Sequence, residues 1–146
     1  MQPRTSIGSI LIAIIALATM AVAQDQPAPE IKHVPIKQTS AASGQEMYRT
    51  YCAVCHGTDG KGKGPAADAL KVPPTDLTTL EQKNGGNYPS LKVGAVIRGE
   101  ETLPAHGSKE MPVWGKLFWN LSGGHESEVQ QRVSNLDKYI ESLQTK

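Results

Sequence analysis

The amino-acid sequence predicts a small all-α domain over residues 40–146, and three stretches support that prediction. Ser43-Gly44-Gln45-Glu46 fits a capping box, in which a serine oxygen and a glutamate carboxylate bond to free amides at a helix N-terminus. Residues 90–98 are largely apolar and are followed by Gly99, a typical helix stop. Residues 126–143 carry one apolar stripe with helical spacing, formed by Val129, Val133, Leu136, Ile140 and Leu143. One stripe needs one partner surface, and we expect the first helix to supply it.

Residues 1–23 have the pattern of a targeting segment. Arg4 precedes an apolar run, and Ala21-Val22-Ala23 then gives the small-residue pattern of a cleavage site before Gln24. The alternative is a retained membrane anchor, because the run reaches the short limit of a bilayer span, about 17 residues. The cleavage site favours removal, so we expect a signal peptide, an exported protein and no membrane insertion of the mature chain.

The charges of the chain nearly balance. There are 15 Lys and Arg against 14 Asp and Glu, and Arg4 is the only charged residue of the leader. The mature chain is therefore close to neutral, which predicts no general attraction to nucleic acid or to anionic membranes. Residues 24–39 follow with three prolines and no sustained apolar period, so we expect a linker or an extended arm. The remaining residues, 40–146, are one small domain by length.

The stretch Cys52-Ala53-Val54-Cys55-His56 is the attachment signature of a c-type haem. Each thiol can form a thioether with one haem vinyl group, and the histidine that follows can bind the iron. Cys52 and Cys55 are the only cysteines, so neither has a disulfide partner elsewhere. The helix that begins near Ser43 is expected to reach this motif. Helical spacing is kept by Met47, Tyr48, Tyr51 and Cys55.

A redox dithiol and a structural zinc site are the two alternatives to haem attachment for this cysteine pair. A redox dithiol normally accompanies a strand–helix–strand pattern, and none is visible. A structural zinc site needs four ligands, and His106 and His125 are too widely separated in sequence to supply a second pair. The composition also favours haem. Only two Trp, four Tyr and one Phe are present to fill a core, and a large flat cofactor would add the missing volume.

Residues 58–76 are rich in glycine and proline and predict a loop. The run Gly60-Lys61-Gly62-Lys63-Gly64 lacks the Walker spacing, so nucleotide binding is not expected. We expect the loop to wrap the haem, with Pro65 in the haem pocket. The Pro65 carbonyl can accept a hydrogen bond from the ring nitrogen of His56 that does not bind iron. A short helix around residues 78–83 should follow.

Residues 100–115 predict a second loop, in which Met111 and Pro112 stand out. A thioether is a soft ligand that suits haem iron, and Pro112 keeps Met111 on a stiff turn. We therefore expect Met111 as the second axial ligand. His106, Lys109 and an open position are the alternatives, and core filling is the usual role of a methionine.

Two tryptophans follow, and we interpret Trp114 and Trp119 as walls of the pocket. A buried indole N–H needs a hydrogen-bond partner, which a haem propionate can supply. Trp114 is the candidate haem-pocket residue.

Residues 43–143 resemble a class I c-type cytochrome, the small mono-haem protein of bacterial respiratory chains. The cysteine–histidine motif is the most specific feature of this resemblance. Gly44 and Tyr48 resemble the family's small and aromatic pair where the terminal helices cross, and Leu136 and Tyr139 resemble the crossing partner. The loops add Gly64-Pro65 and Met111-Pro112-Val113-Trp114-Gly115. The resemblance implies a cytochrome c fold of about four to five helices around one covalently bound haem c.

The resemblance also implies the site and the function. Cys52 and Cys55 would hold the haem by thioethers, His56 would be the proximal axial ligand of the iron, and Met111 the distal one. Such a protein transfers electrons between a donor complex and an oxidase or reductase. It does so in the periplasm, because bacterial haem c is attached outside the cytoplasm. We expect redox proteins as partners, in weak and transient contact.

A haem with two protein axial ligands leaves no position for a substrate, so we expect an electron carrier and not an enzyme. No Ser-His-Asp set, carboxylate pair or general base converges in the sequence. Two rivals stay open. One is a peroxidase-like haem enzyme in which Met111 is displaced. The other is a sensory or structural haem module held in a complex through residues 24–39.

Overall fold

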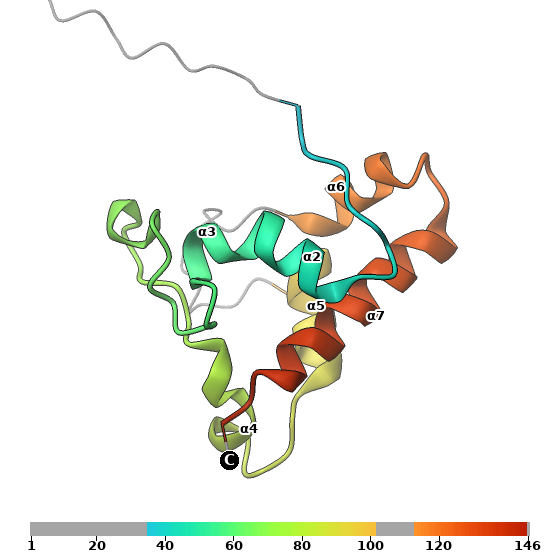
Figure 1. The fold of residues 1–146 in the computed structure, drawn as a ribbon. Coiled ribbons are helices and arrows are strands. Elements are labelled where there is room, and N and C mark those ends of the chain that lie inside the picture. The colour runs from blue at the N-terminus through green and yellow to red at the C-terminus, as the bar shows by residue number, and fades with distance from the viewer. Residues whose placement is uncertain (1–34, 102–112, 146) are drawn as a thin grey trace, which may run out of the picture. The chain divides into compact units, whose positions relative to one another are not determined.

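The computed structural model describes residues 35–101 and 113–145. Its folded unit begins at Ile36. Every regular element of the described residues is helical, which confirms the all-α fold class (Figure 1). The elements in chain order are α2 (Gly44–Met47), η1 (Tyr48–Cys52), α3 (Ala53–His56), η2 (Ala67–Ala69), η3 (Leu77–Thr79), α4 (Leu80–Lys83), α5 (Ser90–Arg98), α6 (Trp114–Leu121) and α7 (Glu126–Ser142).

The first helical segment runs without a break from Gly44 to His56, through α2, η1 and α3. Its N-terminus is capped as predicted, because Ser43 Oγ accepts a hydrogen bond from the Glu46 amide at 3.1 Å. The Glu46 carboxylate does not complete the box on Ser43. It accepts instead from the amide of Ser40 at 3.2 Å, so it holds the chain before the helix as well.

The middle of this segment, η1, is a turn of π-helix that the sequence pattern did not predict. The Ala53 N–H bonds to the Tyr48 carbonyl, five residues back. Single π turns inside α-helices occur frequently at functional sites. This turn ends at Cys52, the first cysteine of the haem signature.

The last helix, α7, packs across α2 at Gly44. A Cβ atom on Gly44 would lie only 1.9 Å from the carbonyl oxygen of Asn135, so a side chain at this position would collide with the α7 backbone. Next to it, the rings of Tyr48 and Tyr139 lie 5.2 Å apart. The predicted stripe faces the core, with Val129, Val133, Leu136 and Ile140 buried and Leu143 partly buried. The expected pairing of the first and last helices is confirmed.

The two helices between the loops also form as predicted. The short helix begins as η3 and continues as α4 to Lys83. Helix α5 ends at Gly99, whose φ of +78° is the left-handed conformation that terminates many helices. Helix α5 packs against both α6 and α7.

A buried carboxylate fixes the start of α5 to α7. The Tyr88 hydroxyl donates to Asp137 Oδ1 at 2.9 Å, and the Ser90 hydroxyl donates to Oδ2 of the same residue. Asp137 is 8% exposed. Burial, followed by the hydrogen bond to Asp137, raises the pKa of Tyr88 above its ordinary value.

Helix α6 corrects the sequence interpretation, which extended a loop to Gly115 and assigned no helix after it. The helix begins one residue earlier, at Trp114. The signal was present in the sequence, since its apolar side chains keep the spacing of one helix face: Trp114, Leu117, Phe118 and Leu121. Phe118 is fully buried in the core.

The end of the predicted arm belongs to the folded unit. Thr39 is 8% exposed, and its carbonyl accepts a hydrogen bond from Arg132 of α7 at 3.0 Å. The predicted signal peptide, residues 1–23, lies outside the described residues. Within residues 35–101 and 113–145, no helix is long and apolar enough to cross a membrane.

Candidate haem site

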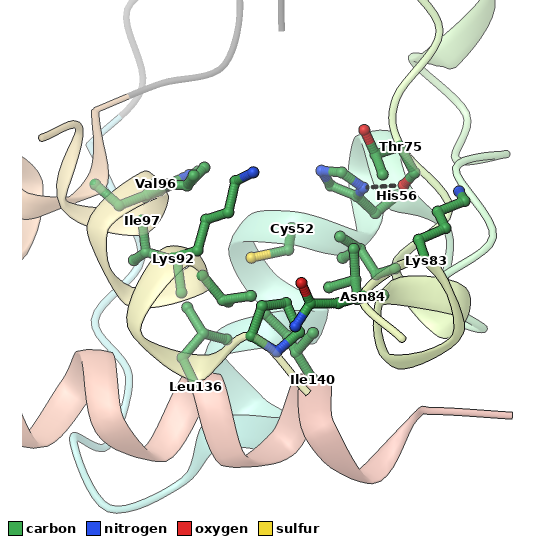
Figure 2. Close-up of a pocket in the computed structure, with 15 residues that line it drawn as sticks. Cys52, His56, Thr75, Lys83, Asn84, Lys92, Val96, Ile97, Leu136 and Ile140 are labelled. Atoms are coloured by element: carbon green, nitrogen blue, oxygen red, sulfur yellow. Dashed lines mark hydrogen bonds between the residues drawn. The ribbon is translucent and has the colours of Figure 1, made fainter. Parts of the chain in front are cut away.

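A cavity of about 340 Å³ lies between the first helical segment, the loop before α4, and helices α5, α6 and α7. Its volume falls in the range of cofactor pockets, about 300–1,000 Å³. Most of the lining is apolar, with Leu77, Leu80, Pro89, Val93, Val96, Ile97, Trp114, Leu136 and Ile140. The other lining residues are Cys52, His56, Thr75, Lys83, Asn84 and Lys92 (Figure 2).

Cys52 and His56 reach the cavity from the same helical segment (Figure 2). Burial, and to a lesser degree the neighbouring Cys55, raises the pKa of the Cys52 thiol to about 12. A thiol with this pKa is protonated at neutral pH. Cys55 is partly buried, and Val54 between the two cysteines is 48% exposed. The motif therefore combines a side chain directed into the cavity with an exposed edge.

His56 is the last residue of α3, and its ring is held in a fixed orientation. Gly57 follows with a φ of +78°, which turns the backbone out of the helix directly after the histidine. His56 is 7% exposed, and its Nδ1 lies 3.0 Å from the Thr75 carbonyl oxygen (Figure 2). A carbonyl can only accept a hydrogen bond, so Nδ1 carries the proton. In the neutral ring the lone pair is then on Nε2, the nitrogen that a metal-ligating histidine uses.

The carbonyl beside His56 was expected to be that of Pro65, and the structure corrects this to Thr75. Pro65 is exposed and does not line the cavity. The reason is the course of the loop, whose first half is hydrogen-bonded to the end of α3. The amides of Gly62, Gly64 and Ala66 bond to the carbonyls of His56, Cys55 and Val54 at 2.8 to 2.9 Å.

Glycine is needed at two positions of this loop. A Cβ on Gly62 would lie 2.3 Å from the Pro74 carbonyl oxygen, and one on Gly64 would lie 2.4 Å from that of Val54. The close approach at Gly62 brings the returning half of the loop against His56, so that Thr75 occupies the accepting position. Nothing in the local sequence distinguished the Thr75 carbonyl from that of Pro65.

Only some of the residues predicted to lie opposite His56 are among those that the structure describes. Trp114, the first residue of α6, lines the cavity as expected. Trp119 is 45% exposed and does not line it. Met111, the predicted axial ligand, and the alternatives His106 and Lys109 lie outside the described residues.

Comparison with known proteins supplies the decisive observation. A family model described as "Cytochrome c" matches residues 41–144. The chain belongs to the cytochrome c family. Comparisons with curated proteins and with solved structures returned no match. The resemblance stated from the sequence is confirmed, and the all-helical unit is consistent with the cytochrome c fold.

Cytochrome c proteins bind haem c covalently through cysteines and generally carry electrons, and this chain has Cys52 and Cys55 at the required spacing. The cavity fits that cofactor on three points. Its walls are apolar, one cysteine side chain enters it, and the buried His56 has the tautomer of a metal ligand. Among the described residues, no group of three or more His, Cys, Asp or Glu could hold a metal ion.

Besides Thr75, the sequence interpretation missed three polar lining residues. Lys83 and Asn84 lie at the end of α4, and Lys92 lies on α5; all three are exposed and line the cavity (Figure 2). For Lys92 the signal was available, because it lies four residues before Val96 of the same wall and so shares its helix face. Two lysines and no Asp or Glu are found among the described residues that line the cavity.

Proposed function

We propose that this cytochrome is an exported electron carrier that receives an electron from one redox protein and passes it to another, in a respiratory chain or a dehydrogenase pathway. The observation that carries the proposal is the arrangement of Cys52 and His56 in one apolar cavity, with the His56 ring held by the Thr75 carbonyl. Haem c, when bound, supplies an iron that alternates between Fe(II) and Fe(III).

In this proposal the residues of the chain hold and tune that iron. Cys52 and Cys55 would hold the haem by two thioethers, and His56 and Met111 would bind its iron. The hydrogen bond from His56 Nδ1 to Thr75 fixes the ring plane and increases the basicity of Nε2. The apolar walls limit the access of water, and a soft methionine sulfur favours Fe(II); both raise the reduction potential.

The two lysines of the cavity lining support haem over a neutral apolar ligand. Neither Lys83 nor Lys92 forms an ion pair among the described residues. The pKa of Asp76 is lowered mainly by its hydrogen bonds with Thr78 and to a lesser degree by Lys83. The two lysines can face the negatively charged propionates of a haem whose flat body lies among the apolar residues. Trp114 is part of the same pocket wall.

We infer that partners dock transiently on the exposed edge of the motif. Val54 lies there with about half of its side chain exposed. Redox encounters of this kind bury a small area, below about 1,200 Å², which allows fast dissociation after transfer. Export to the periplasm through residues 1–23 places the protein where haem c is attached.

An optical spectrum combined with the pyridine haemochrome assay tests the proposal directly. We expect one haem per chain with both vinyl groups converted to thioethers, and reversible oxidation and reduction by small redox mediators. A purified protein without haem c would contradict the proposal.

A ligand-binding experiment separates an electron carrier from a peroxidase-like enzyme. Carbon monoxide added to the reduced protein should bind slowly or not at all, because both axial positions of the iron are taken. Rapid stoichiometric binding would show an open position and would favour the enzyme.

A further inference from the structure

A buried polar network fixes the end of the N-terminal arm to α7. Its centre is Arg132, which is only 3% exposed. Arg132 Nη1 donates to the Thr39 carbonyl at 3.0 Å and to Thr39 Oγ1 at 3.2 Å. The other side of the guanidinium is occupied by Glu128 at 2.7 Å and by the Ser122 hydroxyl at 3.2 Å. Because a buried guanidinium requires partners, the arm is a structural partner of α7.

The same network continues from Thr39 to Tyr51. The Tyr51 hydroxyl donates to the Lys37 carbonyl at 2.6 Å and lies 2.9 Å from Thr39 Oγ1. The single Tyr51 proton is used on Lys37, so the Thr39 hydroxyl donates to the Tyr51 oxygen. The donors therefore follow one direction, from Arg132 through Thr39 and Tyr51 to Lys37, and bonds in such a chain strengthen one another.

The ring of Tyr51 connects this network to the cavity wall. Tyr51 directly precedes Cys52, is 6% exposed, and packs with its ring centroid 5.2 Å from that of Trp114 and 6.0 Å from that of Phe118. Trp114 lines the cavity and lies three residues after Met111 in the sequence. Figure 1 shows the chain from Ile36 passing α7 before it enters α2, as the hydrogen bonds between Thr39 and Arg132 require.

We propose that Tyr51 is a positioning residue of the haem pocket and that residues 36–39 of the arm are its support. The hydroxyl of Tyr51 is fixed by the arm, and its ring in turn fixes the Trp114 side chain against the cavity. This inference rests on the proposed function only in that the cavity holds haem. A purely structural role of the network would change the stability of the protein and leave the haem environment as it is.

Haem-loaded variants of the full chain distinguish these two roles. Tyr51→Phe keeps the ring and removes the hydroxyl, and Thr39→Val removes the hydroxyl that donates to it. We expect both to change the circular dichroism of the haem Soret band, which reports on aromatic rings beside the haem, and to shift the midpoint potential in the same direction. Tyr139→Phe is the matched control, because the Tyr139 hydroxyl forms no hydrogen bond among the described residues. It should leave both signals at their wild-type values.

Deletions test the arm itself. Removal of residues 24–35 behind the signal peptide should preserve the wild-type Soret dichroism and potential, whereas removal of residues 24–39 should reproduce the effect of Tyr51→Phe. Tyr51→Phe placed on the longer deletion should then add nothing further, because the hydroxyl has lost its partners.

Two results would overturn the inference. One is a wild-type Soret signal and potential in Tyr51→Phe and Thr39→Val with only the unfolding midpoint lowered. The other is a full additional effect of Tyr51→Phe on the longer deletion. The pyridine haemochrome assay on each preparation keeps this outcome separate from a failure of the proposed function, which would show as a wild-type protein without haem c.

Discussion

A Cβ atom on Gly44 would stand 1.9 Å from the carbonyl oxygen of Asn135, so the first and last helices meet at a point that admits no side chain. Gly44→Ala should therefore force α2 away from α7. We expect the free energy of unfolding to fall by about 1–3 kcal/mol, the usual cost of overpacking. Guanidinium unfolding followed by circular dichroism measures this change.

Gly94 provides the matched control for that substitution. It lies in the interior of α5, and the nearest atom to its added Cβ would be 3.8 Å away, an ordinary contact. Gly94→Ala should raise the free energy of unfolding by roughly 0.5–1 kcal/mol, because alanine loses less backbone entropy in a helix. If Gly44→Ala is as stable as Gly94→Ala, the described helix crossing is wrong.

The hydroxyl of Tyr88 should make stability depend on alkaline pH. Its pKa is raised in the folded protein by burial and then by the Asp137 hydrogen bond, whereas an unfolded tyrosine titrates near pH 10. The stabilisation by neutral Tyr88 is therefore complete below about pH 10 and is lost as the pH rises further. We expect the free energy of unfolding of the wild-type protein to decline above about pH 10.

Tyr88→Phe separates this contribution from the rest. At neutral pH it should cost about 1.5–3 kcal/mol, the range for hydrogen bonds to charged groups. Above about pH 10 its decline should be shallower than that of the wild-type protein. The free energy of unfolding of this variant should still decline somewhat with pH, because burial also raises the pKa of Tyr48. A Tyr88→Phe protein with the full wild-type slope would show that Tyr88 is not the titrating group.

Met111 is the expected distal ligand, and its loss has a specific optical signature. Met111→Ala should abolish the weak iron–sulfur charge-transfer absorption of the oxidised protein and lower the reduction potential, because soft sulfur favours Fe(II). His106→Ala, in the same loop of the sequence, should keep the band and the potential. Survival of the band in Met111→Ala would assign the sixth position to another residue.

The N-terminal residue of the exported protein tests the predicted processing. Mass spectrometry of protein from the periplasmic fraction should give a chain that begins at Gln24. Ala23→Leu should impair cleavage at the small-residue site and leave the chain in the membrane fraction. A wild-type protein that retains Met1 would instead be anchored by its leader.

Local patterns in the sequence were sufficient for the parts of the fold that local chemistry determines. An apolar stripe such as that from Val129 to Ile140 indicates a helix, and a glycine such as Gly99 ends one, whatever the rest of the fold. The bounds of α7 and α5 were therefore predicted closely. The motif around Cys52 and His56 carries its chemistry in five adjacent residues. Neither prediction required knowledge of distant contacts.

The remaining features depend on contacts that no local pattern encodes. The acceptor of the His56 proton is Thr75 rather than Pro65, because a close approach at Gly62 decides which carbonyl returns to the ring. The connection of Thr39 to Arg132 spans most of the domain. The apolar side chains from Trp114 to Leu121 have helical spacing, but the prolines and glycines before them favoured a loop that continues to Gly115. The role of Met111 and the processing of residues 1–23 stay predictions.

The unbroken segment from Gly44 to His56 has a mechanical consequence. At 1.5 Å per residue this helical segment is about 18 Å long. It packs against α7 at Gly44 and ends at His56. A tilt of about 5° at the Gly44 contact would displace His56 by roughly 1.5 Å, which is more than a precisely held ligand tolerates. The position of His56 in the cavity therefore depends on how the opposite end of this helical segment packs against α7 at Gly44.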